Sequence, residues 1–250
     1  MGLVNGDASP GGATQTKETN VTTTPLTLLS NPIWHALSTS HANFAEGDDR
    51  AKRYPPAVTP LAATRDQSPA SYDSLAQVMQ PGTTAGLLAA TPSLLSGRWT
   101  TLNERKLSQM VWSQITAVEK YPYEDLNSSH ADEMLALVEL TQPGPFGRRT
   151  WEMGSYIGIH RDGQLVAMAG ERLRFPGYTE VSAVCTHPEH RGHGYATSLV
   201  STLIRKIIER NEIPFLHVAA DNIGAISVYE KLGFKTRCIV DLAIVKRESA

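Results

Sequence analysis

The stretch VSAVCTHPEHRGHGYATSLV, residues 181–200, constrains the fold of this chain more than any other. An apolar run ends in a His-Pro pair, Gly192 and Gly194 follow, and a long helical pattern begins directly after them. This order predicts a strand that ends at the N-terminus of a helix, where unpaired backbone amides and the helix dipole favour an anion. Glycine lets a ligand approach the backbone, and Arg191 adds a fixed positive charge. We interpret residues 191–196 as a phosphate-binding turn.

Two common nucleotide-binding signatures do not match this turn. A dinucleotide fingerprint, G-x-G-x-x-G, needs a third glycine where the chain has Thr197, and a Walker loop needs Gly-Lys followed by Ser or Thr. An isolated G-x-G is also compatible with a plain tight connection between strand and helix. The turn is therefore either a phosphate site of another kind or only a connection. The pattern of strands and helices around it bears on which of these interpretations is correct.

The surrounding pattern predicts an α/β fold. Strand patterns cover residues 106–112, 155–160, 164–175, 179–186, 214–220 and 234–245. Helical patterns cover residues 128–140, 193–210 and 222–232, the first with Ser129 as its cap and Asp132 three residues later. An Asp-Gly pair between the second and third strands is typical of a hairpin. This order indicates a mixed, mostly antiparallel sheet with flanking helices.

The chain divides into three predicted segments, which are a disordered tail (1–28), a small N-terminal α/β extension (29–102) and the main domain (103–250). The tail is rich in Thr, Gly, Asn and Ser and has too few apolar residues to offset its ordering entropy. In the extension, residues 31–37 and 71–80 have helical patterns and residues 84–90 form a candidate strand.

Composition excludes several classes of protein. The formal net charge of −2 provides no basic field for nucleic acid or an anionic membrane. The sequence has no run of eighteen apolar residues, so no membrane-spanning helix is predicted. The N-terminus lacks the basic and apolar regions of a signal peptide. Position 6 is Gly6, where a myristoylation signal needs Ser or Thr. Two cysteines make no disulfide framework, so we expect a reducing, cytoplasmic location.

Two motifs together resemble the GNAT superfamily of acyl-CoA-dependent N-acyltransferases. The R-x-x-G-x-A pattern of residues 191–196 resembles the family's CoA pyrophosphate loop. Downstream, the family's last helix is matched by Asn222, Ala225, Tyr229, Gly233 and Phe234. The resemblance covers roughly residues 103–245, and TEVSAVCTHPEHRG more narrowly resembles the group that contains the glycine N-acyltransferases.

The resemblance implies a GNAT fold whose central strands splay apart, so that the gap between residues 184–186 and 215–220 receives the pantetheine arm. It implies acetyl-CoA or another acyl-CoA as co-substrate, no metal, and direct acyl transfer to a primary amine. The cofactor-binding residues that it implies are Val184, Cys185, Thr186, Arg191, Gly192, His193, Gly194, Tyr195, Ala196, Thr197, Asn222 and Tyr229. The amide of Cys185 or Thr186 is the expected donor to the oxyanion.

The resemblance places a catalytic carboxylate at Glu180, which we expect to act as the general base. Strand alternation puts Glu180, Ser182, Val184 and Thr186 on one face unless a bulge intervenes. The alternative is a solvated glutamate at a strand end. Tyr229 is the expected general acid for the CoA thiolate, and its alternative is a core aromatic residue.

Other reactive side chains near the turn have plainer interpretations. Cys185 could form an acyl-enzyme, but a small buried thiol is commonly a packing residue. His187, His190 and His193 span a strand end and a sharp loop, without a helical face to bring them onto one metal ion. His217 is a rival base, or a hydrogen-bonded strand residue.

The acceptor is expected to be a small-molecule amine or an amino acid. A loop with Phe146, Arg148, Arg149 and Trp151 could cover it, with the arginine pair on a carboxylate, or could be a solvated basic loop. The sequence leaves a homodimer open. Two other functions also stay open, namely a CoA-binding sensor without turnover and a nucleotide-binding module unrelated to CoA.

Overall fold

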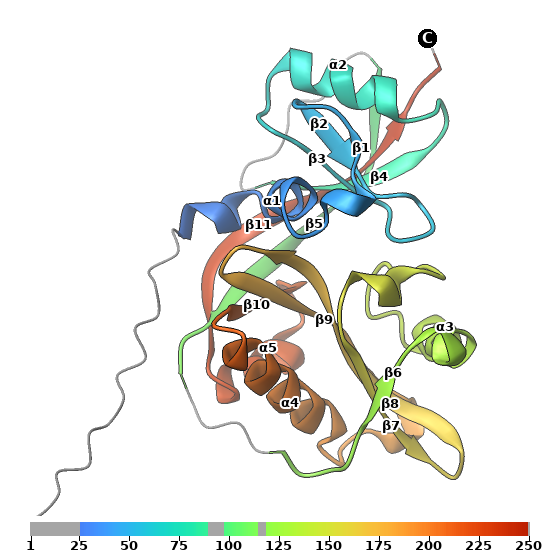
Figure 1. The fold of residues 1–250 in the computed structure, drawn as a ribbon, viewed down its shortest axis with the longest axis vertical. Coiled ribbons are helices and arrows are strands. Elements are labelled where there is room, and N and C mark those ends of the chain that lie inside the picture. The colour runs from blue at the N-terminus through green and yellow to red at the C-terminus, as the bar shows by residue number, and fades with distance from the viewer. Residues whose placement is uncertain (1–25, 90–97, 115–118, 250) are drawn as a thin grey trace, which may run out of the picture.

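The structure is a computed structural model of the chain and describes residues 26–89, 98–114 and 119–249. Its described strands form one eleven-stranded sheet in the order β1-β2-β3-β4-β11-β5-β10-β9-β8-β7-β6 (Figure 1). The strands are β1 (Glu46–Gly47), β2 (Ala51–Arg53), β3 (Leu61–Thr64), β4 (Thr84–Ala89), β5 (Trp99–Trp112), β6 (Glu124–Leu126), β7 (Tyr156–Arg161), β8 (Gln164–Phe175), β9 (Tyr178–Thr186), β10 (Ile213–Ala219) and β11 (Phe234–Arg247). The α-helices are α1 (Pro32–Ser38), α2 (Pro69–Val78), α3 (Ala131–Thr141), α4 (Tyr195–Glu209) and α5 (Ile223–Lys231). The predicted fold class, a mixed and mostly antiparallel sheet with flanking helices, is confirmed.

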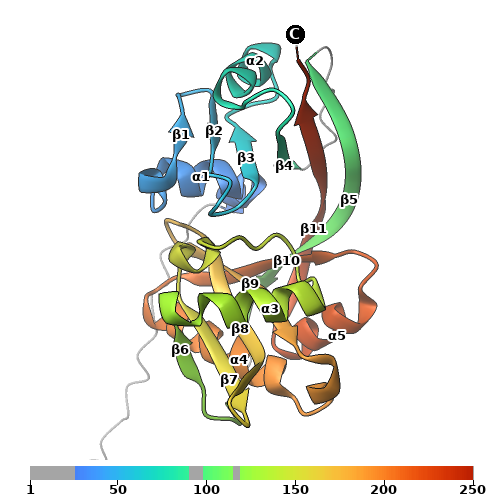
Figure 2. The ribbon, with the colours of Figure 1, turned by 90° about the vertical axis from the view of Figure 1, so that its right-hand side faces the viewer.

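Two long strands join an upper and a lower lobe. The upper lobe holds β1 to β4 and α2, and the lower lobe holds β6 to β10 with α3, α4 and α5 (Figure 1). Strands β5 and β11 are fourteen residues each and pair along their whole length, and Figure 2 shows both rising from the lower lobe into the upper one. The predicted boundary after residue 102 falls inside β5, so the two lobes share strands rather than a linker.

Residues 1–25 of the predicted tail lie outside the described residues, while residues 26–28 begin a 3₁₀ helix, Leu26–Ser30. Strands β1, β2, β3 and β6 were not predicted from the sequence. They contain only two to four residues each, too few for a pattern of alternating side chains.

The antiparallel meander of the lower lobe follows the turn residues in the sequence. Strands β7 and β8 pair around Asp162 and Gly163, whose φ angles of 52° and 78° are those of a two-residue hairpin turn. Strands β8 and β9 pair around Gly177, also at positive φ. The predicted run of three antiparallel strands is confirmed.

Helices cover both faces of the lower lobe. Helix α3 packs Met134 and Leu137 against Met168 of β8 on one face. On the other face, α4 buries the predicted apolar stripe, including Leu199 and Leu203. Within the described residues, no helix has both the length and the apolar character needed to cross a bilayer.

The predicted cap of the helix at residues 128–140 was wrong. Asn127, not Ser129, caps this segment, because the Asn127 side chain accepts a hydrogen bond from the Ser129 amide at 2.9 Å. The His130 ring accepts in return from the Asn127 amide at 3.1 Å. The helix opens with a 3₁₀ turn, so the capping position lies two residues earlier than the spacing to Asp132 predicted.

The parallel strands β9 and β10 separate in the middle of the sheet. They pair only over three residues, from Ile213 opposite Tyr178 to Phe215 opposite Glu180. Beyond that point β9 stays on β8 and β10 stays on β5. The predicted splaying of the central strands is therefore confirmed, and the opening begins next to Glu180.

A β-bulge in β9 changes which side chains share a face. Ala183 has a φ of 51°, and the register with β8 shifts between Ser182 and Cys185. As a result Val184 packs with Val181 in the core under α4 rather than lying on the face of Glu180. The predicted alternation therefore holds from Glu180 to Ser182 and ends at the bulge, which the prediction had allowed for.

Candidate active site

The separation of β9 and β10 opens a cleft of about 920 Å³. Its walls come from the second half of β9, the turn into α4, the end of β10, the start of α5 and the loop after α3. The predicted cofactor residues on these walls are Val184, Cys185, Thr186, Arg191, Gly192, Gly194, Tyr195, Ala196, Thr197, Asn222 and Tyr229. Glu180 and His193, which were also predicted, lie behind the walls.

The turn into α4 presents its backbone to the cleft. Gly192 and Gly194 both have a φ of 83°, a left-handed conformation that side chains with a Cβ rarely adopt. A Cβ on either glycine would meet no atom within 4 Å, so the backbone conformation rather than close packing requires glycine. Gly194 occupies the N-cap without a side-chain cap, which leaves the first amides of α4 available to a ligand.

The histidines around the turn have structural contacts. The His193 ring stacks on Tyr195 at 5.5 Å between centroids, and the Tyr121 hydroxyl donates to the His193 carbonyl at 2.8 Å. His187 accepts from the Glu189 amide at 3.3 Å. Among the described residues, no group of three or more His, Cys, Asp or Glu side chains could hold a metal ion. His193 thus braces the turn from outside the cleft.

Glu180 is a fully buried ion-paired carboxylate, so its interpretation as a solvated strand-end residue was wrong. Arg172 of β8 donates to both carboxylate oxygens, from Nε at 2.8 Å and from Nη2 at 2.7 Å. His217 Nδ1 lies 2.7 Å from Oε1. Burial alone would raise the pKa of Glu180, but the Arg172 charge, its hydrogen bonds and the His217 bond outweigh burial and lower the pKa to about 2.

A second layer of hydrogen bonds fixes the tautomer of His217. Gln109 Oε1 accepts from Arg237 at 2.8 Å, so the Gln109 amide nitrogen must point toward the Leu29 carbonyl at 2.8 Å and toward His217 Nε2 at 3.0 Å. Nε2 of His217 is then an acceptor, and its proton is on Nδ1, from which it donates to Glu180. Of its two interpretations, His217 fits the hydrogen-bonded strand residue.

Tyr229 on α5 lies on the cleft wall. Burial, and to a lesser degree the proximity of Cys185, raises the pKa of Tyr229 to about 12. Its ring packs edge-on against Phe234 at 6.0 Å, and within the described part of the chain its hydroxyl makes no hydrogen bond. The hydroxyl therefore keeps its proton at neutral pH and is free to donate it to a ligand atom.

Cys185 also faces this part of the cleft. Burial raises the pKa of the Cys185 thiol to about 11, although hydrogen bonds from Thr141 and the Met168 backbone oppose the shift. A thiol with this pKa is almost entirely protonated at pH 7, and the thiolate is the nucleophilic form. The environment is that of a packing residue.

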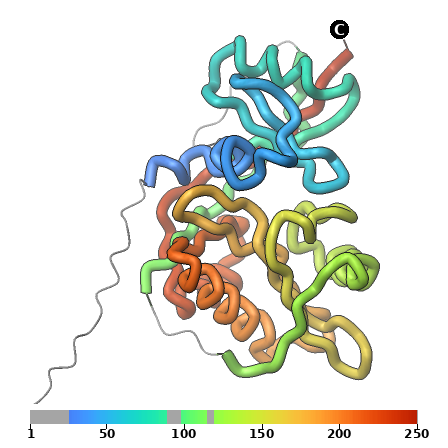
Figure 3. Tube along the Cα trace, viewed as in Figure 1, coloured from blue at the N-terminus to red at the C-terminus, as the bar shows by residue number. Residues whose placement is uncertain are grey.

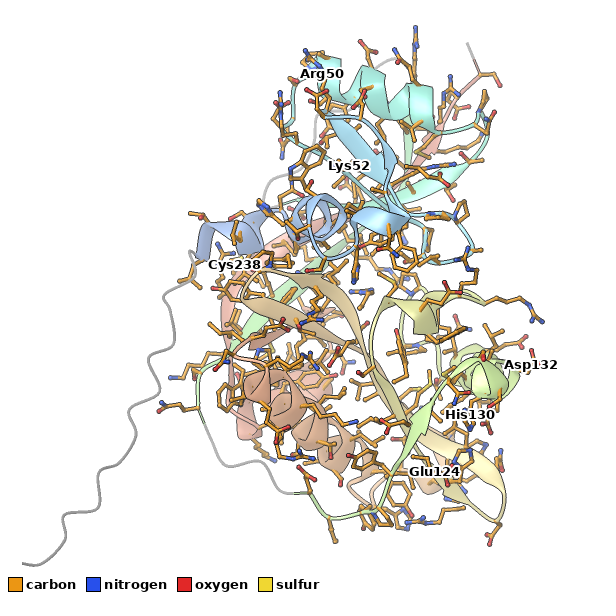
Figure 4. All side chains as sticks on the ribbon, viewed as in Figure 1. Arg50, Lys52, Glu124, His130, Asp132 and Cys238 are labelled. Carbon is orange, nitrogen blue, oxygen red and sulfur yellow. The ribbon has the colours of Figure 1, made fainter. Side chains whose placement is uncertain are left out.

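The predicted basic loop does not face the cleft. Arg148 pairs with Asp132 at 3.3 Å, and Figure 4 places Asp132 on the outer side of α3. Arg149 pairs with Glu152 at 2.7 Å, while Phe146 and Trp151 pack into the core beneath α3. Neither arginine lies on the cleft wall, so of the two interpretations the loop fits the solvated basic loop and not the arginine pair over the acceptor.

The segment after α3 reaches the cleft at another point. Residues 141–145 form part of its wall, and further along the Arg149 amide donates to the Ala57 carbonyl of the upper lobe at 3.0 Å (Figure 3). Sequence reasoning also missed Arg172 and Arg105 on the wall. The available signal for Arg172 was its place across a tight turn from Glu180, but Glu171 and Arg174 lie in the same strand and do not single it out.

Comparison with known proteins agrees with the two sequence motifs. A model of the FR47-like protein family matches residues 156–240. Proteins named acetyltransferase from Yersinia pestis and Pectobacterium atrosepticum are 42% and 44% identical over 53 and 52 residues, 20% of this chain in each case. The match spans only 37% and 36% of the length of those relatives.

Solved structures extend the match to most of the chain. A GCN5-related N-acetyltransferase from Kribbella flavida, 14% identical, has the same fold with a TM-score of 0.57 over 86% of this chain and 94% of that one. A GNAT-family protein from Novosphingobium aromaticivorans is 32% identical, with a TM-score of 0.82, and the alignment covers 88% of this chain and 99% of that protein. The cleft, the glycine turn and this similarity together show that the chain belongs to the GNAT family of acetyltransferases.

Proposed function

We propose that this protein transfers an acetyl or other short acyl group from acyl-CoA to a primary amine by direct transfer. The observation that carries the proposal is a single cleft that joins the open glycine turn, the gap between β9 and β10, and the free hydroxyl of Tyr229. The relatives' names support acetyl as the group transferred. The narrower resemblance to glycine N-acyltransferases stays a prediction.

The cleft offers suitable contacts along the length of CoA. The amides at the start of α4 and the Arg191 guanidinium would hold the pyrophosphate. The His187 amide donates to Val166 of β8 at 2.7 Å, so by alternation the amides of Thr186 and Val184 point away from β8 into the opening. They would pair with the pantetheine arm as with an added strand, and Thr186 is the better placed oxyanion donor of the two expected.

Tyr229 is the proposed general acid. Its hydroxyl is protonated at neutral pH, faces the cleft and has no competing partner among the described residues. As the tetrahedral intermediate collapses, the bond between the acyl carbon and sulfur breaks and Tyr229 donates its proton to the sulfur. The protonated thiol of Cys185 supports direct transfer over an acyl-enzyme.

Glu180 is the proposed general base, with Arg172 and His217 holding its carboxylate in place. With a pKa of about 2 it is ionised at every working pH but holds a proton weakly. Glu180 therefore takes up the proton of the attacking nitrogen as the bond between nitrogen and carbon forms, because bond formation makes the amine a stronger acid. Because Glu180 is 0% exposed, we propose that a water molecule carries the proton to it.

Steady-state acetyl transfer to a panel of amines, followed by thiol release, tests this proposal. We expect Tyr229→Phe and Glu180→Gln to lower kcat roughly 100-fold, with little change in acetyl-CoA affinity. Unchanged turnover in either variant removes that residue from the mechanism. Tight acetyl-CoA binding without thiol release on any amine would instead favour a CoA-binding sensor.

A further inference from the structure

We propose that the acceptor is an amine that carries its own carboxylate and an apolar body, such as an apolar amino acid or a short peptide, and that Arg105 binds the carboxylate. The inference rests on the proposed transferase function, whose acceptor it specifies. It follows from the upper end of the cleft, where the two lobes meet.

The cleft continues past the expected reaction centre onto β5, β11 and the upper lobe. Its wall there includes Leu61, Leu88, Arg105, Leu107 and Leu242. Leu88, Leu242 and Arg105 are direct cross-strand neighbours, so they form one row across β4, β11 and β5.

This row lies on the same face of the sheet as the buried network at Glu180. Residues 105, 107 and 109 alternate onto one face of β5, and Gln109 contacts His217, which contacts Glu180. Gln109 lies four positions along the strand from Arg105, which is roughly 13 Å. An acceptor amine near the thioester and a carboxylate on Arg105 can therefore belong to one small molecule.

The charge on the wall selects the acceptor. Among the described residues of the cleft wall, the charged side chains are Arg105, Arg172 and Arg191, and none is an Asp or Glu. The charge of Arg172 is matched by Glu180 behind the wall, and Arg191 lies at the phosphate-binding turn. A simple alkylammonium would meet the uncompensated charge of Arg105 here, whereas an amine with a carboxylate enters with no net charge.

Arg105 is the cation left for that carboxylate. Its side chain is exposed, and across the described ranges it has neither an ion pair nor a hydrogen bond. Asp241, diagonal to Arg105 in the register of β11 and β5, pairs with Lys106 at 3.2 Å on the opposite face. A guanidinium without a partner among the described residues, beside an apolar row, matches a carboxylate in both charge and geometry.

The apolar part of the acceptor has a matching surface. Leu107 and Leu242 are half-buried, and Leu61 and Leu88 bring apolar surface from the upper lobe. Residues 29–102 would thus shape the acceptor pocket and not only support the sheet. This gives the N-terminal segment a role in substrate selection.

Matched acceptors test the inference with acetyl-CoA as donor. Leucine and alanyl-leucine are each compared with the same molecule lacking its carboxylate. We expect kcat/KM to be at least tenfold higher for the acids, and Arg105→Gln to remove that preference by lowering the values for the acids without lowering those for the amines that lack a carboxylate. Lys106→Gln, one residue away on the opposite face, should leave both values unchanged.

Three results would overturn the inference while leaving acyl transfer intact. They are equal or faster transfer to the amines that lack a carboxylate, an equal loss for both acceptor types in Arg105→Gln, and a raised KM for acetyl-CoA in that variant, which would assign Arg105 to the CoA site. Failure of the wild-type protein to release thiol with any amine would instead count against the transferase function itself.

Discussion

Replacing Glu180 by Gln should destabilise the fold strongly, and the structure gives the size of the effect. The Glu180 side chain is 0% exposed and that of Arg172 is 14% exposed. Removing one partner of a buried ion pair leaves the other charge uncompensated and costs about 3–5 kcal/mol. The lowering of the Glu180 pKa to about 2, from an unfolded value of about 4.3, independently corresponds to roughly 3 kcal/mol.

Thermal unfolding at pH 7 measures this loss. For a chain of this size each kcal/mol shifts Tm by about 2–4 °C, so we expect Glu180→Gln to melt roughly 6–20 °C below the wild-type protein. Glu209→Gln is the matched control, since Glu209 pairs with Arg205 at 3.0 Å on the surface and is 60% exposed. That control should shift Tm by a few degrees at most.

Removing both charges separates the ion pair from other effects. The double variant Arg172→Gln with Glu180→Gln should be less destabilised than the sum of the two single variants, because neither charge is then left alone. A Tm for Glu180→Gln within a few degrees of wild type would refute the description of Glu180 as a buried, charge-compensated group. The proposed role of Arg172 as its holder would then fail as well.

Three further predictions follow from the site. The stabilisation from Glu180 should be fully present above about pH 4.3 and be lost as the pH falls through about 2, because the pKa of Glu180 is lower in the folded than in the unfolded state. Between pH 5 and pH 2 the free energy of unfolding, measured by urea titration, should therefore fall more for the wild-type protein than for Glu180→Gln. Cys185→Ala should keep kcat within a few fold of the wild-type value, whereas complete loss of turnover in this variant would indicate an acyl-enzyme. Gly194→Ala should lose roughly tenfold or more in acetyl-CoA affinity by calorimetry. Gly163→Ala, which has a similar φ at the tip of a hairpin, should lose stability as Gly194→Ala does but should keep its affinity for acetyl-CoA. Equal affinities in the two variants would contradict the assignment of the turn.

Much of the lower lobe could be predicted because its signals are local. The Asp162-Gly163 turn, the apolar stripe of α4 and the glycine after α5 each depend on residues close together in the sequence. The same holds for the turn at residues 191–196, whose glycines mark positive φ angles. These features predict the elements that form the phosphate end of the cleft.

The acceptor end could not be predicted because its residues meet only through tertiary structure. Glu180, Arg172 and His217 come from three different strands, and the contact between Glu180 and His217 joins residues 37 positions apart. The bulge at Ala183 has no glycine to mark it, yet it decides the direction of every later side chain in β9. Arg105 gains its significance only from the register of β4, β11 and β5.

The most direct test of the account is calorimetric titration of the folded protein with acetyl-CoA, in parallel with CoA, a longer acyl-CoA and ATP. The account predicts binding selective for the CoA compounds, weakened in Gly194→Ala. No binding of any CoA species, or preferential binding of ATP, would contradict the assignment of the 191–196 turn and of the transferase function that depends on it.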